Sequence, residues 1–562
     1  MRLPSSGSSA ACAAAIIACA CFVGCASSLT STSGTDAAAR EDLGVDIDLG
    51  SVDAGGVDGG SFDAGGFDSG ADIDLGGLPD SGGSDAGSPD EGDYYVSPTG
   101  NDSNPGTIEA PFRTLAKLNN VLHTLGAGAA GKTAYIRGGT YLSEAGDDAS
   151  NHFILEDLHG TAGAPIRIWA YPGEKPIFSC ANITPTYEYP FVFVLLNSSY
   201  VHLKGFTVTM LAQVPSGVGI SRGVNISGCE HCTIELFDIS NIAGAGFTLS
   251  QSSVTPSTNN HLLNIDSHHN GDGLGDPAFP EYGSWNTGDG FGCSGGDEST
   301  DNVYEGCRAW LNSDDGYDWF DWAGARVTLS GCWSFWNGIK PWGPTNTTPN
   351  DSEMTPEDPA VFFGVEGYVV SIEAGEGFKL GGHGSAGPPG MPTVLKKYLD
   401  HCVSFENVGT GYSANMMAEF SHQMQIVNSV AYHNGNDGFG FGTGRSVGIA
   451  HIFRNDWAYA NNRLQSGGDW VYDGLDDNIS NNVWATTHDG IDYGNLSPGV
   501  TINDADFMST SSVGAAGPRQ ADGSLPNLPF LRLVAGSDLL DRGTDVGFPF
   551  NGAAPDVGAY ER

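Results

Sequence analysis

The sequence predicts an all-β fold, a right-handed parallel β-helix that winds as a single-stranded solenoid behind a short N-terminal capping helix. Three observations support it. Short phrases ending in Asn recur along the chain, their side chains alternate between small and aromatic residues with the period of a strand, and Gly accounts for 82 of 562 residues. We therefore expect one long solenoid rather than several layered domains.

The net charge limits the partners that the protein can bind. Asp and Glu number 67 against 23 Lys and Arg, which gives a formal charge of −44 at pH 7. Such a field repels nucleic acid, anionic lipid and acidic polymers. We therefore expect no nucleic-acid partner, and an acidic substrate would need a cation between it and the protein.

Residues 1–25 are typical of an export signal. Arg2 precedes a small, apolar run at 10–21 that is too short to cross a bilayer as a permanent helix. Phe22-Val23-Gly24-Cys25 resembles a bacterial lipobox, in which Cys25 would become the lipidated N-terminus. We expect an outer-membrane lipoprotein at the cell surface that meets the membrane only through this lipid anchor. The alternative is cleavage by an ordinary signal peptidase and simple secretion.

Residues 26–92 are expected to form a disordered tether between the anchor and the folded domain. Asp-Gly phrases recur between Asp53 and Asp90, and the stretch from Glu41 to Asp93 holds 15 acids without a Lys or Arg. Such a composition buries no core, and its like charges extend the chain. The β-helix domain is therefore expected at residues 93–562.

The folded part is expected to open with a cap. Tyr94-Tyr95-Val96 reads as a strand, residues 111–122 carry apolar side chains at helical spacing, and Ala134-Tyr135-Ile136-Arg137 reads as a further strand. The first coil of a solenoid has an open end that must be covered. We expect the helix within 111–122 to cover it.

The repeat is a strand phrase that ends in Asn. Its base period is about 25–29 residues, lengthened by insertions at roughly 271–288 and 338–372. A stack of Asn at one corner would satisfy turn backbone groups in coil after coil. The insertions are expected to be loops over one face, where function tends to sit. The aligned residues are Asn241, Asn270, Asn312, Asn337, Asn407, Asn434 and Asn461.

Cysteines follow the same repeat. Cys307, Cys332 and Cys402 each stand five residues before a repeat Asn, where they form either a stacked core ladder or a ladder with two members bridged. Cys229-Glu-His-Cys232 could hold zinc, but no second ligand pair is evident in the sequence, so packing or a disulfide is expected instead.

A second phrase after the Asn, Asp-Gly-aromatic or a variant of it, brings carboxylates together. Equivalent residues of adjacent coils lie one strand spacing apart, roughly 4.8 Å. In three successive coils the phrase begins at Asp289, Asp315 and Glu376. Three positions later stand Gly292, Asp318 and Lys379. With Asp314, the repeat gathers four Asp on two coils beside the Lys of a third.

The four Asp are candidate metal ligands. Clustered carboxylates are unfavourable unless a cation neutralises them, and an all-oxygen ligand set suits Ca²⁺. Each Asp could instead only make a turn, since Asp-Gly is a common turn pair, but turn chemistry does not ask for Asp318. We therefore expect Asp289, Asp314, Asp315 and Asp318 to bind Ca²⁺.

Lys379 is the candidate catalytic residue, because it is one of only eight lysines and stands inside the acidic column. A lysine beside carboxylates is ordinarily an ion pair with a raised pKa, whereas a dication among them pushes the lysine pKa down. A neutral amine could remove the C-5 proton of a uronic acid while Ca²⁺ stabilises the developing charge. The C-4 oxygen would then leave, giving an unsaturated product.

Three stretches of the chain share motifs with a known family: Gly288–Phe291, Gly306–Trp319 and Gly375–Gly382. They resemble polysaccharide lyase family nine, the pectate lyases of β-helix fold. Matching motifs imply that the four Asp hold one Ca²⁺, that Lys379 is the catalytic base and that the substrate is pectate or a related acidic polysaccharide. In two places the chain departs from the family: the long gap before Gly375, and Ser413 where Asp is expected.

Two other functions stay open on the sequence. Asn286-Thr-Gly-Asp289, Asp314-Asp315 and Gly382-His-Gly384 loosely match polygalacturonases, β-helix hydrolases that use paired carboxylates as acid and base. A non-catalytic solenoid that binds glycans through aromatic residues such as Trp319 is the other alternative. For each function we expect a monomeric protein.

Overall fold

The computed structural model describes most of the chain after residue 90, and all of that part belongs to one unit, Asp74–Arg562. The predicted export signal and nearly all of the predicted tether lie outside the described residues and stay predictions. The described segments are 91–143, 151–186, 190–212, 221–250, 252, 255–272, 287–293, 299–319, 326–341, 368–370, 375–381, 394–414, 422–441, 451–461, 470–472, 478–484 and 500–562.

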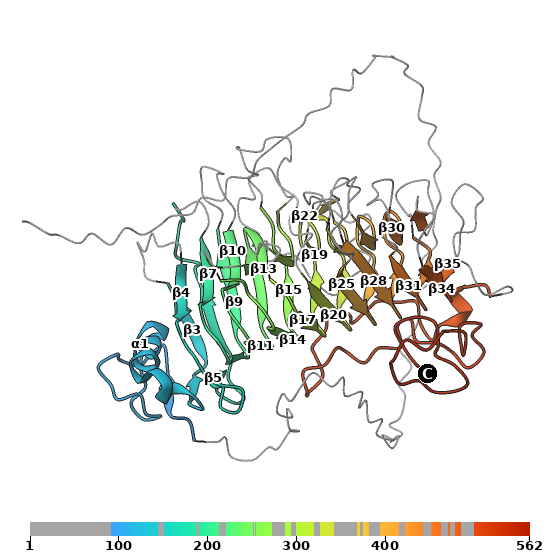
Figure 1. The fold of residues 1–562 in the computed structure, drawn as a ribbon. Coiled ribbons are helices and arrows are strands. Elements are labelled where there is room, and N and C mark those ends of the chain that lie inside the picture. Colours follow the sequence, from blue (N-terminus) through green and yellow to red (C-terminus); the bar gives the residue numbers. More distant parts are fainter. Residues whose placement is uncertain are drawn as a thin grey trace, which may run out of the picture. The chain divides into compact units, whose positions relative to one another are not determined.

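Among these residues the chain winds through three long parallel sheets, and successive coils add strands to each sheet in turn (Figure 1). The predicted all-β parallel β-helix is confirmed. The 12-stranded sheet contains, in spatial order, β1 (Tyr94–Val96), β2 (Thr133–Ile136), β5 (Ile166–Ala170), β8 (Val201–Lys204), β11 (Thr233–Glu235), β14 (His261–Leu263), β17 (Asn302–Glu305), β20 (Val327–Ser330), β25 (Val394–Asp400), β28 (His422–Val427), β31 (Ile452–Arg454) and β34 (Asn478–Ser480).

The other two sheets follow the same order of coils. The 11-stranded sheet contains β3 (Gly139–Leu142), β6 (Pro176–Ser179), β9 (Thr207–Leu211), β12 (Asp238–Ile242), β15 (Asp266–His268), β18 (Arg308–Trp310), β21 (Trp333–Phe335), β26 (Val403–Phe405), β29 (Val430–Tyr432), β32 (Trp457–Tyr459) and β35 (Val483–Trp484). The 10-stranded sheet contains β4 (Asn151–Glu156), β7 (Phe191–Leu196), β10 (Ser221–Ser227), β13 (Gly244–Ser250), β16 (Phe291–Cys293), β19 (Tyr317–Asp318), β24 (Phe378–Lys379), β27 (Tyr412–Ser413), β30 (Phe439–Phe441) and β33 (Trp470–Tyr472).

The predicted capping helix is α1 (Leu115–Leu125), followed by the 3₁₀ turn Gly126–Ala129. Thr114 caps its N-terminus by accepting a hydrogen bond from Lys117 N, and Gly126, at φ 53°, ends it. The helix buries Leu118 and Leu122 against the first coils. It is joined to β4 by a hydrogen bond from Glu156 N to Asn119 Oδ1, at 3.0 Å. The open end of the solenoid is therefore covered as predicted.

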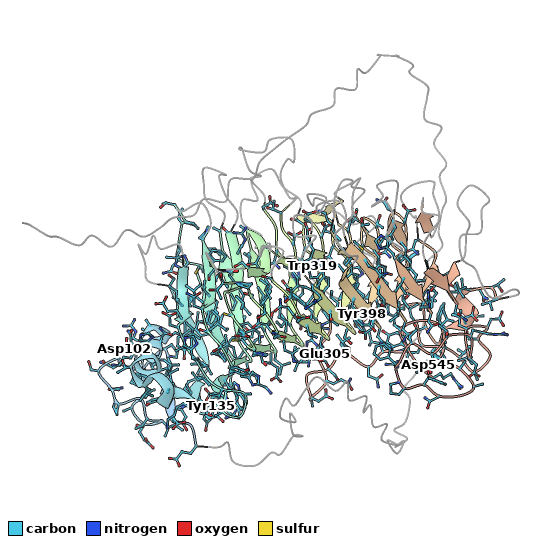
Figure 2. The ribbon with its side chains drawn as sticks, viewed as in Figure 1. Asp102, Tyr135, Glu305, Trp319, Tyr398 and Asp545 are labelled. Carbon is cyan, nitrogen blue, oxygen red and sulfur yellow. The ribbon has the colours of Figure 1, made fainter. Side chains whose placement is uncertain are left out.

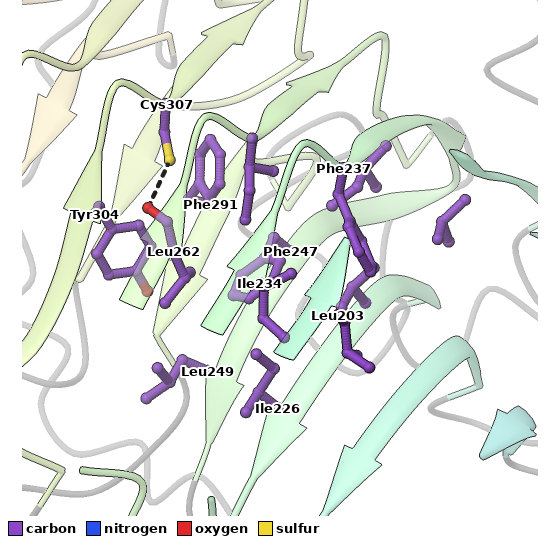
Figure 3. Close-up of a cluster of buried hydrophobic side chains, with 14 of the residues drawn as sticks. Leu203, Ile226, Ile234, Phe237, Phe247, Leu249, Leu262, Phe291, Tyr304 and Cys307 are labelled. Carbon is purple, nitrogen blue, oxygen red and sulfur yellow. Dashed lines mark hydrogen bonds between the residues drawn. The ribbon is translucent and has the colours of Figure 1, made fainter. Parts of the chain in front are cut away.

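The interior is filled by columns of apolar side chains, one from each coil (Figure 3). The aromatic residue that follows the Gly of each phrase forms one of these columns on the 10-stranded sheet, with consecutive ring centroids 4.7 to 5.9 Å apart. Stacked aromatic rings bury large apolar areas and fix the strand register. The column consists of Phe247, Phe291, Tyr317, Phe378, Tyr412 and Phe439.

The Asn stack is a hydrogen-bonded ladder. From Asn270 through Asn461, the Nδ2 of each Asn donates to the Oδ1 of the next at 2.9 to 3.1 Å. Each receiving Oδ1 also accepts the backbone N–H of the preceding ladder Asn. The ladder is therefore confirmed for every predicted Asn except Asn241.

The alignment was wrong by one residue at Asn241. The register pairs Ser240 with His268, so Ile242 stands opposite Asn270, whose Oδ1 accepts Ile242 N at 3.2 Å. Asn241 has φ 57°, the left-handed conformation that His269 also adopts just before the ladder. Among non-glycine residues Asn adopts this conformation readily. Asn241 therefore makes the turn and takes no part in the ladder.

Cys307, Cys332 and Cys402 are buried free thiols, so the unbridged core ladder is the correct alternative. The Sγ of Cys307 donates to Leu262 O at 3.3 Å (Figure 3). Cys229 and Cys232 are also free and fully buried, and they pack in the core, so the packing alternative is confirmed over a disulfide.

The C-terminal segment, residues 500–562, packs on the outer face of the 11-stranded sheet. Trp333, Val403 and Trp457 point outward from that sheet and are buried in one apolar cluster with Phe507 and Phe530. The same outward column carries polar residues in earlier coils, such as Thr207 and Asp238. The boundary between the covered and the uncovered part of the face lies at Arg308, which pairs with Asp266 on one side and Trp333 on the other.

Arg308 fastens this segment to the sheet. Its guanidinium is 2% exposed and donates two hydrogen bonds to the Asp266 carboxylate, at 2.8 and 2.6 Å. Nη1 donates to Ala515 O and Gly517 O of the C-terminal segment. Arg519 Nη2 also donates to Asp266, at 2.6 Å. One buried carboxylate is therefore shared by two guanidinium groups that hold the segment in place.

We predict that Arg308→Ala destabilises the protein by about 2–4 kcal/mol, because it takes one of the two guanidinium partners from Asp266 and leaves two carbonyls of the C-terminal segment without their donor. Arg326→Ala is the matched control, since Arg326 also pairs with an Asp, Asp301, but at the surface, with both side chains more than 40% exposed. This control is expected to lose less than about 1 kcal/mol. Urea unfolding followed by Trp fluorescence measures both, and similar losses in the two variants would contradict the role of Arg308.

Candidate functional site

The predicted site lies on the outer face of the 10-stranded sheet. In β19 and β24, Tyr317 is paired with Phe378 and Asp318 with Lys379. Both aromatic rings are fully buried in the core. Since side chains alternate along a strand, Asp318 and Lys379 project outward, and each side chain keeps 17% of its surface exposed. The predicted register of Lys379 is therefore confirmed.

Lys379 is held between two carboxylates. Its Nζ donates to Asp315 Oδ2 at 2.9 Å and to Asp318 Oδ2 at 3.2 Å. The Asp315 side chain is only 1% exposed, so the ammonium group is fixed on the protein side and partly open on the other. The Lys379 side chain therefore reaches solvent on the side away from Asp315.

Asp289, Asp314 and Asp315 form the compact part of the acidic cluster. Each offers one carboxylate oxygen, and these three oxygens all lie within 4.8 Å of one another. All three residues are at most 9% exposed. Asp318 is not part of this compact group, and it joins the site through Lys379. The structure thus brings all five predicted residues together, with Asp318 at the edge.

Backbone amides orient the central carboxylate. Asp315 Oδ1 accepts hydrogen bonds from Gly375 N at 3.2 Å and from Glu376 N at 2.6 Å. Asp289 Oδ1 in turn accepts from Asp315 N at 3.2 Å. The turn of each coil therefore holds the acid of the coil before it. Sequence reasoning did not find this role for Gly375 and Glu376, because they stand 60 and 61 residues after Asp315.

The Gly of the Asp-Gly pair lets the coils approach closely at the site. A Cβ on Gly316 would lie 2.0 Å from Ser334 Oγ and 2.8 Å from the carbonyl of Gly377 in the next coil. No side chain fits in that space. The phrase therefore needs Gly after the acid for packing, and this stacks the acids at the spacing of the strands.

The carboxyl groups of the acidic cluster repel one another, and this repulsion raises the pKa of several of them. Burial and the charges of Asp318 and Asp315 raise the pKa of Asp289 well above its usual range. Burial and the charges of Asp315 and Asp289 do the same to the pKa of Asp314. Burial and the Asp315 charge raise the pKa of Glu376 to about 8. A bound cation would relieve these interactions.

Lys379 experiences opposing effects. Burial by itself would lower its pKa, but the charges of Asp315 and Asp318 outweigh burial, and the pKa of Lys379 lies well above the ordinary value. With the carboxylates unneutralised the amine therefore stays protonated. A dication among these Asp residues would cancel the field that holds the proton.

The donor set fits Ca²⁺. Within the described part of the site, five carboxylates from Asp289, Asp314, Asp315, Asp318 and Glu376 face a single ammonium group, that of Lys379. All potential ligand atoms are oxygens, which hard divalent cations prefer, and no thiol or imidazole belongs to the cluster. Asp289, Asp314 and Asp315 are the residues that would hold the ion.

The surroundings of the site are described in part. Most of both predicted insertions, at 273–286 and 342–367, lies outside the described residues. At the base of the second insertion, β22 (Ile339–Pro341) and β23 (Tyr368–Val370) form an antiparallel pair.

Trp319, a predicted candidate for glycan binding, is fully buried in the core (Figure 2). No helix of the described part is both long and apolar enough to span a membrane.

Comparison with known proteins adds a family to this geometry. Residues 94–353 match the family model described as "Pel9A-like, right handed beta helix region". Pectate lyase L of Dickeya dadantii (strain 3937) is 27% identical over 471 residues, which cover 84% of this chain and 90% of that protein. The match therefore extends over nearly the whole folded part.

Two solved structures share the fold. The crystal structure of pectate lyase Pel9A superposes with a TM-score of 0.59 at 26% identity, over 84% of this chain and 96% of that one. A rhamnogalacturonan lyase superposes with a TM-score of 0.54 at 26% identity, over 79% of this chain and 96% of that one. The predicted resemblance and the right-handed winding of the β-helix are both confirmed.

Proposed function

We propose that this chain, a polysaccharide lyase similar to the Pel9A-like right-handed β-helix proteins, cleaves pectate or a closely related uronate polymer by Ca²⁺-assisted β-elimination with Lys379 as general base. One observation carries the proposal: the partly exposed Lys379 amine lies against Asp315 and Asp318, directly beside the compact cluster of Asp289, Asp314 and Asp315.

The acidic cluster has two tasks in this mechanism. Asp289, Asp314 and Asp315, with Asp318 at the edge of the cluster, would hold Ca²⁺, and the bound ion would supply positive charge for the substrate carboxylate and for the carbanion-like charge that develops beside it. The protein carries a charge of −44 and would otherwise repel a polyuronate. The same Asp residues keep Lys379 in a fixed position, so the base needs no rearrangement before it reacts.

Lys379 moves the proton. Its neutral Nζ takes the proton from C-5 of the uronate at the site, and the electrons of the C–H bond form the double bond between C-4 and C-5. The bond from C-4 to the glycosidic oxygen breaks, and the oxygen leaves with its electron pair and is protonated from solvent. The products are a chain with a 4,5-unsaturated end and a chain with a new reducing end.

A second substrate is favoured by one observation. The superposed rhamnogalacturonan lyase has the same identity to this chain, 26%, as the superposed pectate lyase. A rhamnogalacturonan backbone also contains uronate residues, and elimination at these would use the same base. Polygalacturonate remains the first substrate to test, because the relatives from Dickeya dadantii and Emericella nidulans are named pectate lyases.

We predict that the protein incubated with polygalacturonate and Ca²⁺ produces a product that absorbs in the ultraviolet, because elimination creates a conjugated double bond. Lys379→Ala is expected to lower kcat by about 10²–10⁴-fold, as for loss of a general base. Lys204→Ala, which removes a Lys paired with Glu235 on the 12-stranded sheet, is the matched control and is expected to keep full activity. Reducing ends without absorbance would indicate a hydrolase, and an equally active Lys379→Ala would end the base assignment.

We predict that Ca²⁺ raises the unfolding temperature of the wild-type protein and that excess EDTA removes both this increase and the activity. At a concentration 100 times Kd the stabilisation is about 2.7 kcal/mol. Asp314→Asn is expected to lose the Ca²⁺-dependent increase without lowering the metal-free unfolding temperature, because it removes one of several repelling charges. Asp301→Asn, an exposed Asp in the same coil, is the control. A full increase in Asp314→Asn would contradict the ligand assignment.

We also propose that the protein is exported and anchored by a lipid on Cys25, with residues 26–92 as the tether. The expected result is incorporation of labelled palmitate and recovery in the outer-membrane fraction. Cys25→Ser should abolish labelling and release the protein, while Cys21→Ser, in the same signal, should not. Unlabelled wild-type protein in the medium would favour simple secretion.

A further inference from the structure

A row of outward residues continues from the site toward the N-terminal coils of the 10-stranded sheet. Asp318 is paired with Gly292, Gly292 with Thr248, and Thr248 with Asn225. Lys379 is paired with Asp318, so Asn225 stands four strand spacings from the base, about 19 Å. The row lies along the solenoid axis on the same face as the proposed catalytic group.

Two hydroxyl groups fix the orientation of the Asn225 amide. Asn225 Oδ1 accepts hydrogen bonds from Thr248 Oγ1 and from Ser250 Oγ, each at 3.0 Å. Thr248 Oγ1 also lies 3.3 Å from Val224 O and shares its one hydrogen between the two acceptors, whereas Ser250 Oγ donates to Asn225 Oδ1, and a flipped amide would lose this hydrogen bond. Nδ2 is left as a donor, and its direction is fixed because Thr248 and Ser250, both in β13, hold the other end of the amide.

The Asn225 nitrogen is available to a ligand. Within the described part of the chain Nδ2 donates to no acceptor, and it is not among the polar atoms that are sealed from solvent without a partner. Asn225 keeps 7% of its surface exposed. A donor fixed in this way, on the face that would hold the substrate, suits an oxygen of a sugar better than it suits a structural role.

Gly292 keeps the row open between Asn225 and the acidic cluster. A Cβ placed on Gly292 would have one neighbour within 4 Å, Thr248 Cγ2 at 3.7 Å, so packing does not require Gly here. Because Gly292 has no side chain, nothing projects from the outer face of the sheet at this position between Thr248 and Asp318. An extended polymer lying along the row would pass over this residue.

We propose that Asn225 is a substrate-binding residue whose Nδ2 donates to a carboxylate or hydroxyl oxygen of an acidic polysaccharide, several sugars away from the bond that is cleaved. The proposal rests on the proposed function, because it needs the polymer to lie over Lys379. It sets the direction of the bound chain along the solenoid axis and extends the binding face toward β10. Thr248 and Ser250 act as positioning residues that hold the amide.

The experiment measures binding of galacturonate oligomers to Lys379→Ala in the presence of Ca²⁺, by titration calorimetry, so that no ligand is consumed. Asn225→Ala in this background is expected to weaken a long oligomer about tenfold, as for loss of one hydrogen bond to a charged group, and trigalacturonate less than twofold. A trimer over residue 379 is too short to reach Asn225. A long oligomer bound equally by both proteins, or a trimer weakened as much as the long oligomer, would overturn the proposal.

A second pair of variants tests the orientation of the amide. Thr248→Val keeps the β-branched shape but removes one donor to Asn225 Oδ1, and it should weaken the long oligomer in the same chain-length-dependent way. Thr209→Val, on the 11-stranded sheet, loses a comparable hydrogen bond, to Ser240 O at 2.9 Å, and should not. Equal effects of the two would contradict the positioning role. If Lys379→Ala bound neither oligomer while folded, the proposed function would fail rather than the role of Asn225.

Discussion

The site depends on one constraint, the stacking of equivalent residues at one strand spacing in successive coils. The aromatic column under the site fixes this register, since Phe291, Tyr317 and Phe378 stack with centroids 4.7 to 4.8 Å apart. Whatever follows these rings by one residue is carried to the outer face at the same spacing. Asp318 and Lys379 are neighbours for this reason, although 61 residues separate them in the chain.

The same stacking has opposite consequences for different side chains. An amide has a donor and an acceptor, so stacked Asn residues bond to one another from Asn270 to Asn461. Carboxylates have only acceptors, and two unit charges one strand spacing apart repel by roughly 3 kcal/mol at an effective dielectric constant of 20. The turns place this repulsion around Asp315, where two backbone amides and Lys379 offset part of it. The remaining charge is what a cation would neutralise.

The sequence was sufficient for those parts of the site that lie in the repeat. Asp315, Asp318 and Lys379 were placed correctly because the Gly and aromatic residue of each phrase mark the register without reference to chain length. The sequence was insufficient to place a residue where the same residue type suits two different structural positions. Asn241 was read as a ladder residue but makes a left-handed turn, and both positions favour Asn. The amides of Gly375 and Glu376 left no signal, because any residue supplies a backbone N–H.

The outer faces of the solenoid show how sequence could have indicated which face is free for a substrate. On the 11-stranded sheet, the outward column changes from Asp266 to Trp333 across Arg308, and the apolar part is covered by residues 500–562. On the 10-stranded sheet the outward column at the site is polar, with Thr248, Asp318 and Ser413, and the inward residue that precedes each of them is aromatic. A polar column above an aromatic one has no apolar surface to attract a covering segment. The outward residues of this face therefore offer polar groups to a hydrophilic polymer rather than an apolar surface to another segment of the chain.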